Sequence, residues 1–396
     1  MTKYSTLTII SCFFVFAISF SSFGQSVPEP PGTVISYMSK ETGKYIGSPS
    51  ICILPDGTYI ASHDEFGPKS KEFASAQTRI FSSNDKGKTW QQIANIDGQF
   101  WSNLFVQNGA LYIMGTNKHH GNFIIRKSTD NGHTWTIPYS KTTGLLIEGE
   151  YHNAPVPVLI HNGRIWRALE YATAPTTRWG KRYSAMMISA SVNADLLNAD
   201  NWRRTNALPY DSTYLDGKFN AWLEGNAVVS KDGKVLDILR VDVPAGNAEV
   251  AAFVNISKDG KKASFDAQTG FVPMPGASKK FTIRYDNVSD RYWALLNVVD
   301  TLYKTKTPAS IRNQLALGSS ADLKNWEIHE QLLYHPDISK HGFQYVDWQF
   351  EQNDIIFASR TAYDDASGGA NNFHDANFLT FHRIEDFRKH VNKTRK

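Results

Sequence analysis

Cysteine is almost absent from this chain. Only Cys12 and Cys52 occur among 396 residues, and Cys12 lies in an N-terminal apolar segment that we expect to be removed. The remaining chain would keep a single cysteine, which excludes an internal disulfide. The sequence also contains neither a C-x-x-C nor an H-E-x-x-H pattern. We therefore predict no catalytic metal and no required cofactor, and leave open only a structural calcium ion.

Long apolar runs and helical patterns are equally scarce. After residue 24, no stretch is apolar for long enough to span a membrane. Helical periodicity is limited to short pieces at Asn193 to Asn198 and Ile384 to Val391. Elsewhere, short segments rich in Val, Ile, Tyr, Phe and Trp alternate with Gly, Asn and Asp turns. These patterns predict an all-β protein.

A strong excess of charge is also missing. Lysine and arginine number 42 and the acidic residues 38, so the formal net charge is +4. No basic stripe or basic helix is present, and we predict no nucleic-acid partner. The mild positive charge suits an anionic substrate, although many proteins with neutral substrates share it.

The N-terminus has the pattern of a secretory leader. Lys3 is followed by the apolar segment Leu7 to Phe20 and by the small-residue site Ser22-Phe23-Gly24. We predict a signal peptide over 1–24 and export to the periplasm or cell surface, with an uncleaved anchor as the alternative. No composition break follows the linker Val27 to Gly32, so 25–396 is predicted to be one domain and a monomer.

One hairpin organises the middle of the chain. Two apolar runs flank Lys231-Asp232-Gly233, and Asp-Gly between such runs is a strong hairpin signal. The open ends of this hairpin carry Glu224 and Arg240, sixteen residues apart. Folding at the turn brings both ends to one edge of a sheet, so a carboxylate and a guanidinium should face the same space.

The same turn-and-strand unit recurs about every 50–70 residues, the period of a four-stranded propeller blade. The turns are Asp56-Gly57, Asn108-Gly109, Asn162-Gly163, Asp232-Gly233, Ser289-Asp290 and Asn353-Asp354. Six turns predict six blades, and the shorter spacings leave seven as the alternative. The strands after these turns should place their ends around one mouth of the axis, in a ring formed by His63, Asp64, Thr116, Asn117, Glu170, Arg240, Asn297 and Arg360.

Two loops share the pattern S-x-D-x-G-x-T-W. They run from Ser83 to Trp90 and from Ser128 to Trp135, and a weaker copy runs from Ser320 to Trp326. The aspartate is expected to close a turn through backbone N–H groups, the glycine to adopt a positive φ, and the tryptophan to pack into a blade. This is the Asp-box of sialidase-type propellers, a signal for fold more than for chemistry.

On these motifs the chain resembles the sialidase superfamily over most of its mature length. The resemblance implies a carboxylate-binding set of arginines, with Arg240 and Arg312 as the second and third. It implies Tyr345, in Tyr345-Val-Asp347, as a nucleophile assisted by Glu224. Two positions depart from the pattern. Gly47 stands where the first arginine belongs, and the segment expected to carry the acid/base aspartate offers only Glu72.

The chain also resembles Asp-box propellers that are uronate-glycan lyases, including rhamnosyl-glucuronate and ulvan lyases. That resemblance implies Tyr151 and Arg167, sixteen residues apart, with His120 or its neighbour His119 before the second S-x-D-x-G-x-T-W loop. The partner histidine of that branch is missing, because Phe100-Trp101 stands at its place. We consider His63 as its substitute.

Both resemblances lead to an acidic oligosaccharide or polysaccharide as substrate. The favoured prediction is β-elimination across C4–C5 of a uronic acid, by a lyase or a dehydratase. Tyr151, His120 or His63 would act as base, and Arg167 would neutralise the carboxylate. Further substrate contacts are predicted for Glu224, Arg240, Arg312, Tyr345, Arg360, Glu170 and His119. The alternatives are a glycoside hydrolase, either a divergent sialidase or an α-L-rhamnosidase-like enzyme, and a non-catalytic glycan-binding propeller.

Overall fold

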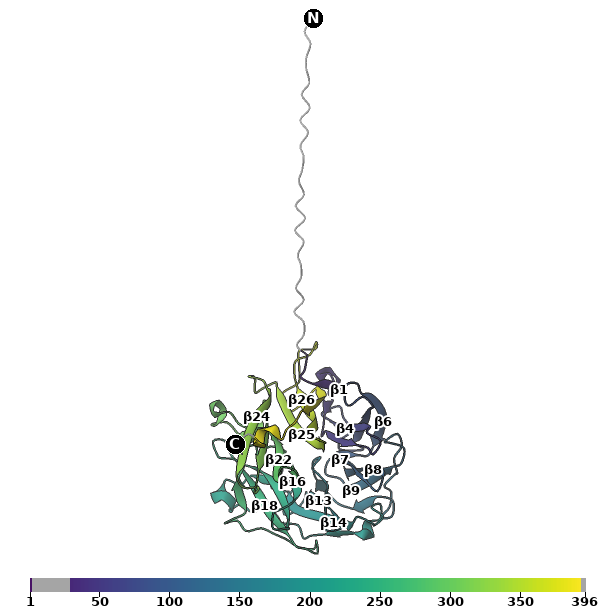
Figure 1. Ribbon diagram of the computed structural model, residues 1–396, viewed down its shortest axis with the longest axis vertical. Helices are drawn as coiled ribbons and strands as arrows, with labels where there is room; N and C mark the ends of the chain where they lie inside the picture. Colours follow the sequence, from purple (N-terminus) through teal and green to yellow (C-terminus); the bar gives the residue numbers. More distant parts are fainter. Residues whose placement is uncertain (2–28, 393–396) are drawn as a thin grey trace.

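The computed structural model describes residues 29–392 together with Met1. The predicted signal peptide lies almost wholly outside the described residues. The described chain forms six antiparallel sheets around a central axis, and is therefore an all-β, six-bladed propeller (Figure 1). Among the described residues, no helix is both long and apolar enough to cross a membrane.

The blades are numbered I to VI in chain order, and each runs from an inner strand at the axis to an outer strand. Blades I to III contain β2 (Tyr45–Ile46) with β3 (Ser50–Ile53), β4 (Tyr59–Phe66), β5 (Gln77–Ser83) and β6 (Gln91–Asp97); β7 (Phe100–Gln107), β8 (Ala110–Thr116), β9 (Phe123–Ser128) and β10 (Leu145–Ile147); and β11 (Tyr151–His152) with β12 (Leu159–His161), β13 (Arg164–Tyr171), β14 (Ser184–Ser191) and β15 (Trp202–Arg204).

Blades IV to VI complete the ring. They contain β16 (Ala221–Val229), β17 (Val235–Asp242), β18 (Val250–Ile256), and β19 (Ala263–Ser264) with β20 (Phe271–Pro273); β21 (Thr282–Asp286), β22 (Arg291–Leu296), β23 (Gln314–Ser320) and β24 (Trp326–Tyr334); and β25 (Gly342–Glu351), β26 (Asp354–Ala362), β27 (Phe378–Ile384) and β1 (Thr33–Tyr37). The first strand of the described chain thus pairs with the last, so the two ends of the sequence close the ring in one blade.

In the part of the chain that the structure describes, helical structure is confined to short connections. These are η1 (Lys40–Thr42), η2 (Ala199–Asn201), η3 (Tyr214–Gly217), η4 (Thr301–Tyr303), η5 (Pro308–Ser310) and α1 (Lys389–Asn392). The helical piece expected at 193–198 is instead a turn that precedes η2. The C-terminal piece is confirmed only as the single helical turn of α1.

Each of the six predicted turns joins the first and second strands of a blade, so the prediction of six blades is confirmed and the alternative of seven is wrong. Gly57, Gly109, Gly163 and Gly233 all have positive φ, the conformation for which glycine is favoured at a tight turn. Among the described residues, one large apolar cluster fills the space between each pair of neighbouring blades, and a small seventh cluster lies between blades III and IV. Successive side chains of each strand therefore pack alternately against the preceding and the following blade.

The S-x-D-x-G-x-T-W loops lie between third and fourth strands, at the periphery. In the first, Asp85 accepts hydrogen bonds from the backbone N–H and the hydroxyl of Thr89, at 2.9 and 2.6 Å. Trp90 donates to the carbonyl of Gly87 at 3.2 Å and packs against the cluster between blades VI and I. The second loop repeats these contacts. The expected turn geometry is confirmed.

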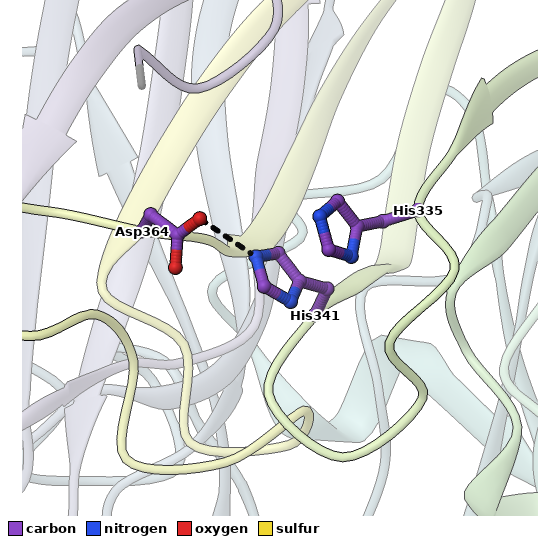
Figure 2. Close-up of side chains that lie close together, drawn as sticks. All are labelled: His335, His341 and Asp364. Carbon is purple, nitrogen blue, oxygen red and sulfur yellow. Dashed lines mark ion pairs between the residues drawn. The ribbon is translucent and has the colours of Figure 1, made fainter. Parts of the chain in front are cut away.

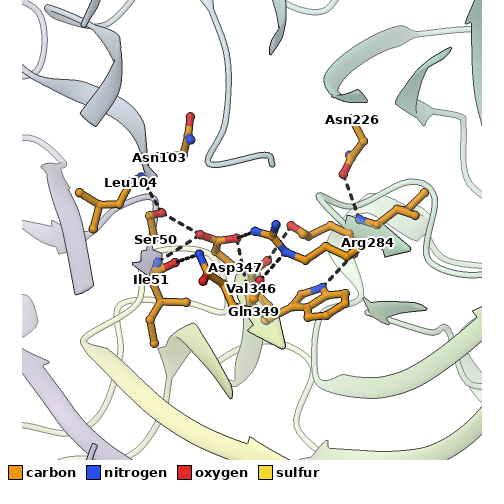
Figure 3. Close-up of polar contacts among 12 residues, drawn as sticks. Ser50, Ile51, Asn103, Leu104, Asn226, Arg284, Val346, Asp347 and Gln349 are labelled. Atoms are coloured by element: carbon orange, nitrogen blue, oxygen red, sulfur yellow. Dashed lines mark hydrogen bonds and ion pairs between the residues drawn. The ribbon is translucent and has the colours of Figure 1, made fainter. Parts of the chain in front are cut away.

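A buried carboxylate joins the inner strands at the axis (Figure 3). Asp347, on the inner strand of blade VI, accepts hydrogen bonds from Ser50 Oγ at 2.7 Å and Ile51 N at 3.1 Å, both in blade I. Its other oxygen lies 3.4 Å from Nη2 of Arg284 in blade V. Ser50 Oγ in turn accepts from Leu104 N in blade II at 2.9 Å. Asp347 therefore links blades V, VI and I directly, and Ser50 extends this link to blade II.

We predict that Asp347→Ala lowers the free energy of unfolding by about 3 kcal/mol, because it leaves buried donors of two neighbouring blades without their acceptor. Chemical denaturation of the purified variant measures the change. Asp200→Ala is the matched control, since Asp200 is 65% exposed and forms only a surface ion pair with Lys141. Equal stability of the two variants would contradict the linking role of Asp347.

Candidate active site

A pocket of about 180 Å³ opens at the axis, on the face where inner strands begin and second strands end. Its lining combines titratable and aromatic side chains: Gly47, Ser48, Asp64, Phe66, Glu72, Phe100, Trp101, His119, His152, Asn153, Trp179, Glu224, Tyr345, Arg360 and His374. A larger hollow of about 570 Å³ lies at the opposite end of the axis, lined mainly by turn residues and apolar side chains such as Val158 and Ile160. Volume alone would favour the larger hollow, but the groups able to perform acid, base or nucleophilic chemistry gather in the smaller pocket.

Three inner strands carry a strained residue at the pocket. Trp101, Glu224 and Tyr345 have φ of 50°, 59° and 54°, a left-handed conformation that is unfavourable for residues with a side chain. Each lies where the register between the first and second strands of its blade shifts, so each occupies a β-bulge. The strain is on the order of 1–3 kcal/mol per residue. We call these three the bulge residues; they belong to blades II, IV and VI.

Each bulge is held by a buried polar side chain from the preceding blade. Asp64 of blade I accepts a hydrogen bond from Trp101 N at 2.8 Å. Glu170 of blade III accepts from Gly225 N, next to Glu224, at 3.2 Å. Asn297 of blade V donates to the carbonyl of Phe343, near Tyr345, at 2.7 Å. These three holding residues belong to the ring predicted from the six turns, and their contacts show that the ring fastens one blade to the next.

Arginines surround the second and third bulge residues. Arg240 Nη1 donates to Glu224 Oε2 at 2.9 Å, so the two ends of the central hairpin meet as predicted. The guanidinium of Arg312 lies 5.3 Å from the ring centre of Tyr345, and that of Arg360 lies 4.9 Å from it. Burial alone would raise the pKa of Glu224, but the positive charges of Arg240 and of other nearby groups hold it below the usual value. Glu224 is therefore an ionised carboxylate in a cationic setting.

Gly47 leaves no room for a side chain. A Cβ atom at this position would lie 2.5 Å from the carbonyl oxygen of Asp64 and 2.7 Å from its carboxylate. The first arginine of the sialidase pattern therefore cannot be accommodated here without moving Asp64. Arg360, which enters from the second strand of blade VI, lines the same pocket as Gly47. The guanidinium that lines the described pocket therefore comes from blade VI and not from the blade of Gly47.

Histidines and aromatic rings form the wall on the side of blades II and III. His152 Nδ1 lies 2.7 Å from Glu170 Oε2, and both side chains are almost fully buried. The His152 ring packs 4.6 Å from Trp101 and 4.4 Å from Tyr183, measured between ring centres. A carboxylate only accepts hydrogen bonds, so Nδ1 of His152 carries the proton and Nε2 is left for the pocket.

His119 lines this wall, whereas His120 lies behind it. His120 Nε2 lies 3.0 Å from the hydroxyl of Tyr183 and its Nδ1 lies 3.0 Å from Arg182 Nη1. Burial, reinforced by nearby positive charge, lowers the pKa of His119 to about 4 and that of His120 to about 2. Both rings are consequently neutral at ordinary pH.

Two acidic side chains on the blade I side have raised pKa values. Burial raises the pKa of Glu72 to about 7, with a smaller contribution from the charge of Asp64. Burial raises the pKa of Asp64 to about 6, although its hydrogen bonds from Trp101 N and Ser48 N oppose the shift. Both carboxylate oxygens of Asp64 already accept hydrogen bonds from these two backbone N–H groups. Glu72, on the loop between β4 and β5, is the pocket carboxyl best suited to carry a proton near neutral pH.

Like His120, the three other residues predicted to be catalytic in the elimination reaction lie outside the pocket lining. Tyr151 packs in the apolar cluster between blades II and III, and burial raises the pKa of its hydroxyl. Arg167 is fully buried and donates to Asn103 Oδ1 at 2.9 Å and Ala154 O at 2.7 Å. His63 is bonded to Asp64 O and to Ser36 Oγ, both at 3.0 Å. These positions do not fit the predicted contacts of a base and a carboxylate clamp with substrate.

The remaining predicted residues lie in the pocket or next to it. Glu224, Tyr345, Arg360 and His119 line the pocket, and Arg240 and Arg312 contact the first two from behind. Glu170 is buried beneath His152. Sequence reasoning did not single out His152, Trp101 and Trp179. The one available signal for His152 was strand alternation, since it follows Tyr151 directly and must face the other way.

Comparison with known proteins supports the fold. No family model matches the chain, and no curated protein matches it. Among solved structures, a Penicillium chrysogenum α-L-arabinanase complexed with arabinobiose superposes with a TM-score of 0.53 at 12% identity, over 89% of this chain and 97% of that one. A Hadza microbial sialidase gives 0.59 at 11% identity, over 89% and 68%. A Dyadobacter fermentans protein of unknown function gives 0.58 at 12%, over 90% and 99%. The fold is that of a sialidase-like six-bladed propeller.

The contact between Glu170 and His152 gives a test of the pocket geometry. In a Glu170→Gln variant the amide oxygen keeps the bond from Gly225 N, so the amide NH₂ faces His152 Nδ1. We predict that the ring proton then moves from Nδ1 to Nε2, which nitrogen chemical shifts of the histidine ring report directly. Glu327→Gln, on an exposed outer strand, should leave the His152 signals unchanged. An Nε2-protonated His152 in the unmodified chain would contradict the described contact.

Proposed function

We propose that this chain is a glycoside hydrolase that removes a carboxylate-bearing sugar from an acidic oligosaccharide. The observation that carries the proposal is the joint presentation of Glu224 and Tyr345 by matching strained bulges, with three arginines around them. The fold shared with solved sialidases and arabinanases, and the motif resemblance to sialidases, support the same reaction class. The prediction of elimination loses weight because the four residues predicted to be catalytic, Tyr151, His63, His120 and Arg167, all lie outside the pocket lining.

A tyrosine nucleophile suits an anionic substrate. A carboxylate nucleophile would be repelled by the carboxylate of the sugar, whereas a phenol is neutral until it reacts. Ionised Glu224 takes the phenolic proton as Tyr345 Oη attacks the anomeric carbon. The cations of Arg240, Arg312 and Arg360 favour the phenolate that forms. The carbon–oxygen bond to the leaving group breaks as that oxygen receives a proton.

Glu72 is the proposed donor of that proton. Its carboxyl lines the pocket on the blade I side and its raised pKa keeps it protonated up to about pH 7. After the leaving group departs, ionised Glu72 takes a proton from a water molecule, whose oxygen attacks the anomeric carbon. The carbon–oxygen bond to Tyr345 breaks, and the phenolate takes its proton back from Glu224. Glu72 therefore serves as acid and then as base.

The arginines are the proposed binding set for the sugar carboxylate. Arg360 lines the pocket, and both Arg312 and Arg360 lie against the ring of Tyr345. Charge-assisted hydrogen bonds from guanidinium to carboxylate are worth roughly 1.5–3 kcal/mol each. The proposal retains the sequence-based expectations of an exported, monomeric protein without a required cofactor for this reaction.

Elimination from a uronate glycan is the second candidate, on one observation. His152 is oriented by Glu170 through Nδ1 and turns Nε2 toward the pocket, which is the arrangement of a general base. Such a base abstracts the hydrogen next to a carboxylate that the arginines have neutralised, and the 4-substituent then leaves. The ultraviolet absorbance of the resulting conjugated double bond distinguishes this outcome, because hydrolysis releases reducing sugar without that absorbance.

We expect Tyr345→Phe and Glu224→Gln to lower kcat by roughly 10³-fold or more while changing the Kd of an anionic oligosaccharide little, since both groups act mainly in the transition state. Turnover and calorimetric binding measure the two quantities. His152→Gln is the discriminating control. Should His152→Gln abolish turnover while Tyr345→Phe retains it, the hydrolase scheme is wrong and elimination is favoured.

The raised pKa of Glu72 predicts the basic limb of the pH profile. A general acid must be protonated, so kcat/KM should fall about tenfold per pH unit once the pH exceeds about 7, where Glu72 loses its proton. Glu72→Gln should remove this limb, and should lower activity less on substrates with good leaving groups than on natural glycosides. Glu327→Gln should keep the wild-type profile. If kcat/KM of Glu72→Gln still falls above about pH 7 as in the unmodified chain, another group donates the proton to the leaving group.

A further inference from the structure

Two histidines and an aspartate converge on the face that carries the pocket. His335 and His341 belong to the loop between β24 and β25, and Asp364 follows β26 (Figure 2). One ligand atom from each residue lies within 4.8 Å of the others. The group draws on two loops that are distant in sequence and lies outside the lining of the pocket described above.

His341 is held between two carboxylates. Its Nδ1 lies 3.3 Å from Asp337 Oδ2 and its Nε2 lies 3.4 Å from Asp364 Oδ2. The residue is 4% exposed, and Nε2 is a buried atom without a hydrogen-bond partner among the described residues. When Nδ1–H donates a hydrogen bond to Asp337, the lone pair of Nε2 faces the carboxylate of Asp364. A positive charge between these atoms would replace repulsion by attraction.

His335 presents a second nitrogen to the same space. Its ring stacks on that of His341, with 3.4 Å between centres and 17° between planes. Nδ1 of His335 accepts a hydrogen bond from Asp337 N at 3.1 Å, so Nε2 is the nitrogen available to a ligand. An ion bound at Nε2 places the ring proton on Nδ1, so this hydrogen bond is given up. The stacked rings also have to tilt apart for both lone pairs to point at one ion.

We propose that His335, His341 and Asp364 bind one zinc ion. Two imidazole nitrogens and one carboxylate oxygen form a ligand set that zinc accepts, whereas calcium and magnesium prefer oxygen alone. Asp337 supports the site as a carboxylate behind His341, an arrangement common around metal-bound histidines. The side chain of Asp364 is 46% exposed, which leaves the fourth position of a tetrahedral ion to water. The sequence motifs gave no indication of this site, because Asp364 lies on another loop.

Zinc would join two loops that hold the arginine side of the pocket. Phe373, on the loop after β26, donates its N–H to Ser339 O at 2.8 Å, which already connects the loops. The carbonyl of His374 accepts from Arg360 Nε at 3.1 Å, and the Phe373 ring lies 5.9 Å from the guanidinium of Arg312. The ion would therefore brace the surroundings of Arg312 and Arg360. This role is independent of the reaction that the pocket performs.

Calorimetric titration of the metal-free full chain, purified without a polyhistidine tag, with Zn²⁺ tests the site. We expect one equivalent to bind and to raise the Tm, and Co²⁺ in its place to give the visible absorption of a tetrahedral ion. Asp364→Asn and His335→Gln should each weaken binding at least tenfold. Their positions are partly exposed, so folding should be kept, which circular dichroism verifies. His133→Ala, at an exposed histidine on blade II, should bind as the unmodified chain does.

Two outcomes would overturn the site. The first is absence of saturable zinc binding, which would leave His341 with only the carboxylates of Asp337 and Asp364 as its partners. The second is equal zinc affinity in the unmodified chain, Asp364→Asn and His335→Gln, which would place the ion elsewhere.

Discussion

The candidate site depends on three inner strands whose backbone turns left-handed at the mouth of the axis. At Trp101, Glu224 and Tyr345 the chain adopts a conformation that an isolated strand would avoid. The bulge redirects the side chain toward the axis, where a regular strand would place it between blades. Such strain persists only where the surroundings fix it. Here the fixing groups are Asp64, Glu170 and Asn297, each from the blade before.

This arrangement joins stability and chemistry in the same residues. Glu170 holds the bulge beside Glu224 and also fixes the tautomer of His152. Asp64 holds Trp101 and fills the space next to Gly47, so it also decides where the third arginine can enter. The alternation is regular: odd blades supply the holding groups and even blades the bulges. A substitution in any holding residue is therefore expected to affect folding and the pocket together.

Much of the fold followed from local sequence signals. The six turns are short-range features, so they located all six blades, and the hairpin around Asp232-Gly233 correctly brought Glu224 and Arg240 together. Two helical pieces were less reliable, because segments of that length take their structure from tertiary contacts. The signal peptide, the export and the oligomeric state stay predictions.

The site was harder to predict, because it depends on which face of a strand each residue occupies. Tyr151 and His152 are adjacent, and the pairing of β11 with β13 sets His152 opposite Glu170 and turns Tyr151 into the core. The sixteen-residue spacing to Arg167 had pointed to Tyr151 and not to His152. The bulges at Trp101, Glu224 and Tyr345 lack the glycine that usually marks a left-handed position, so no local signal revealed them. In the sequence, Glu72 stood out only as the acidic residue in the segment where the sialidase pattern expects an acid/base aspartate.

The most direct test of the account is a crystal structure of the chain with a bound sugar acid. The account predicts that the sugar carboxylate lies within hydrogen-bonding distance, about 2.7–3.2 Å, of at least two of Arg240, Arg312 and Arg360. Tyr345 and Glu224 should keep their left-handed backbone and face the anomeric carbon. A carboxylate bound away from these arginines, or a relaxed backbone at Tyr345, would contradict the claim that the strained bulges build an anion-binding active site.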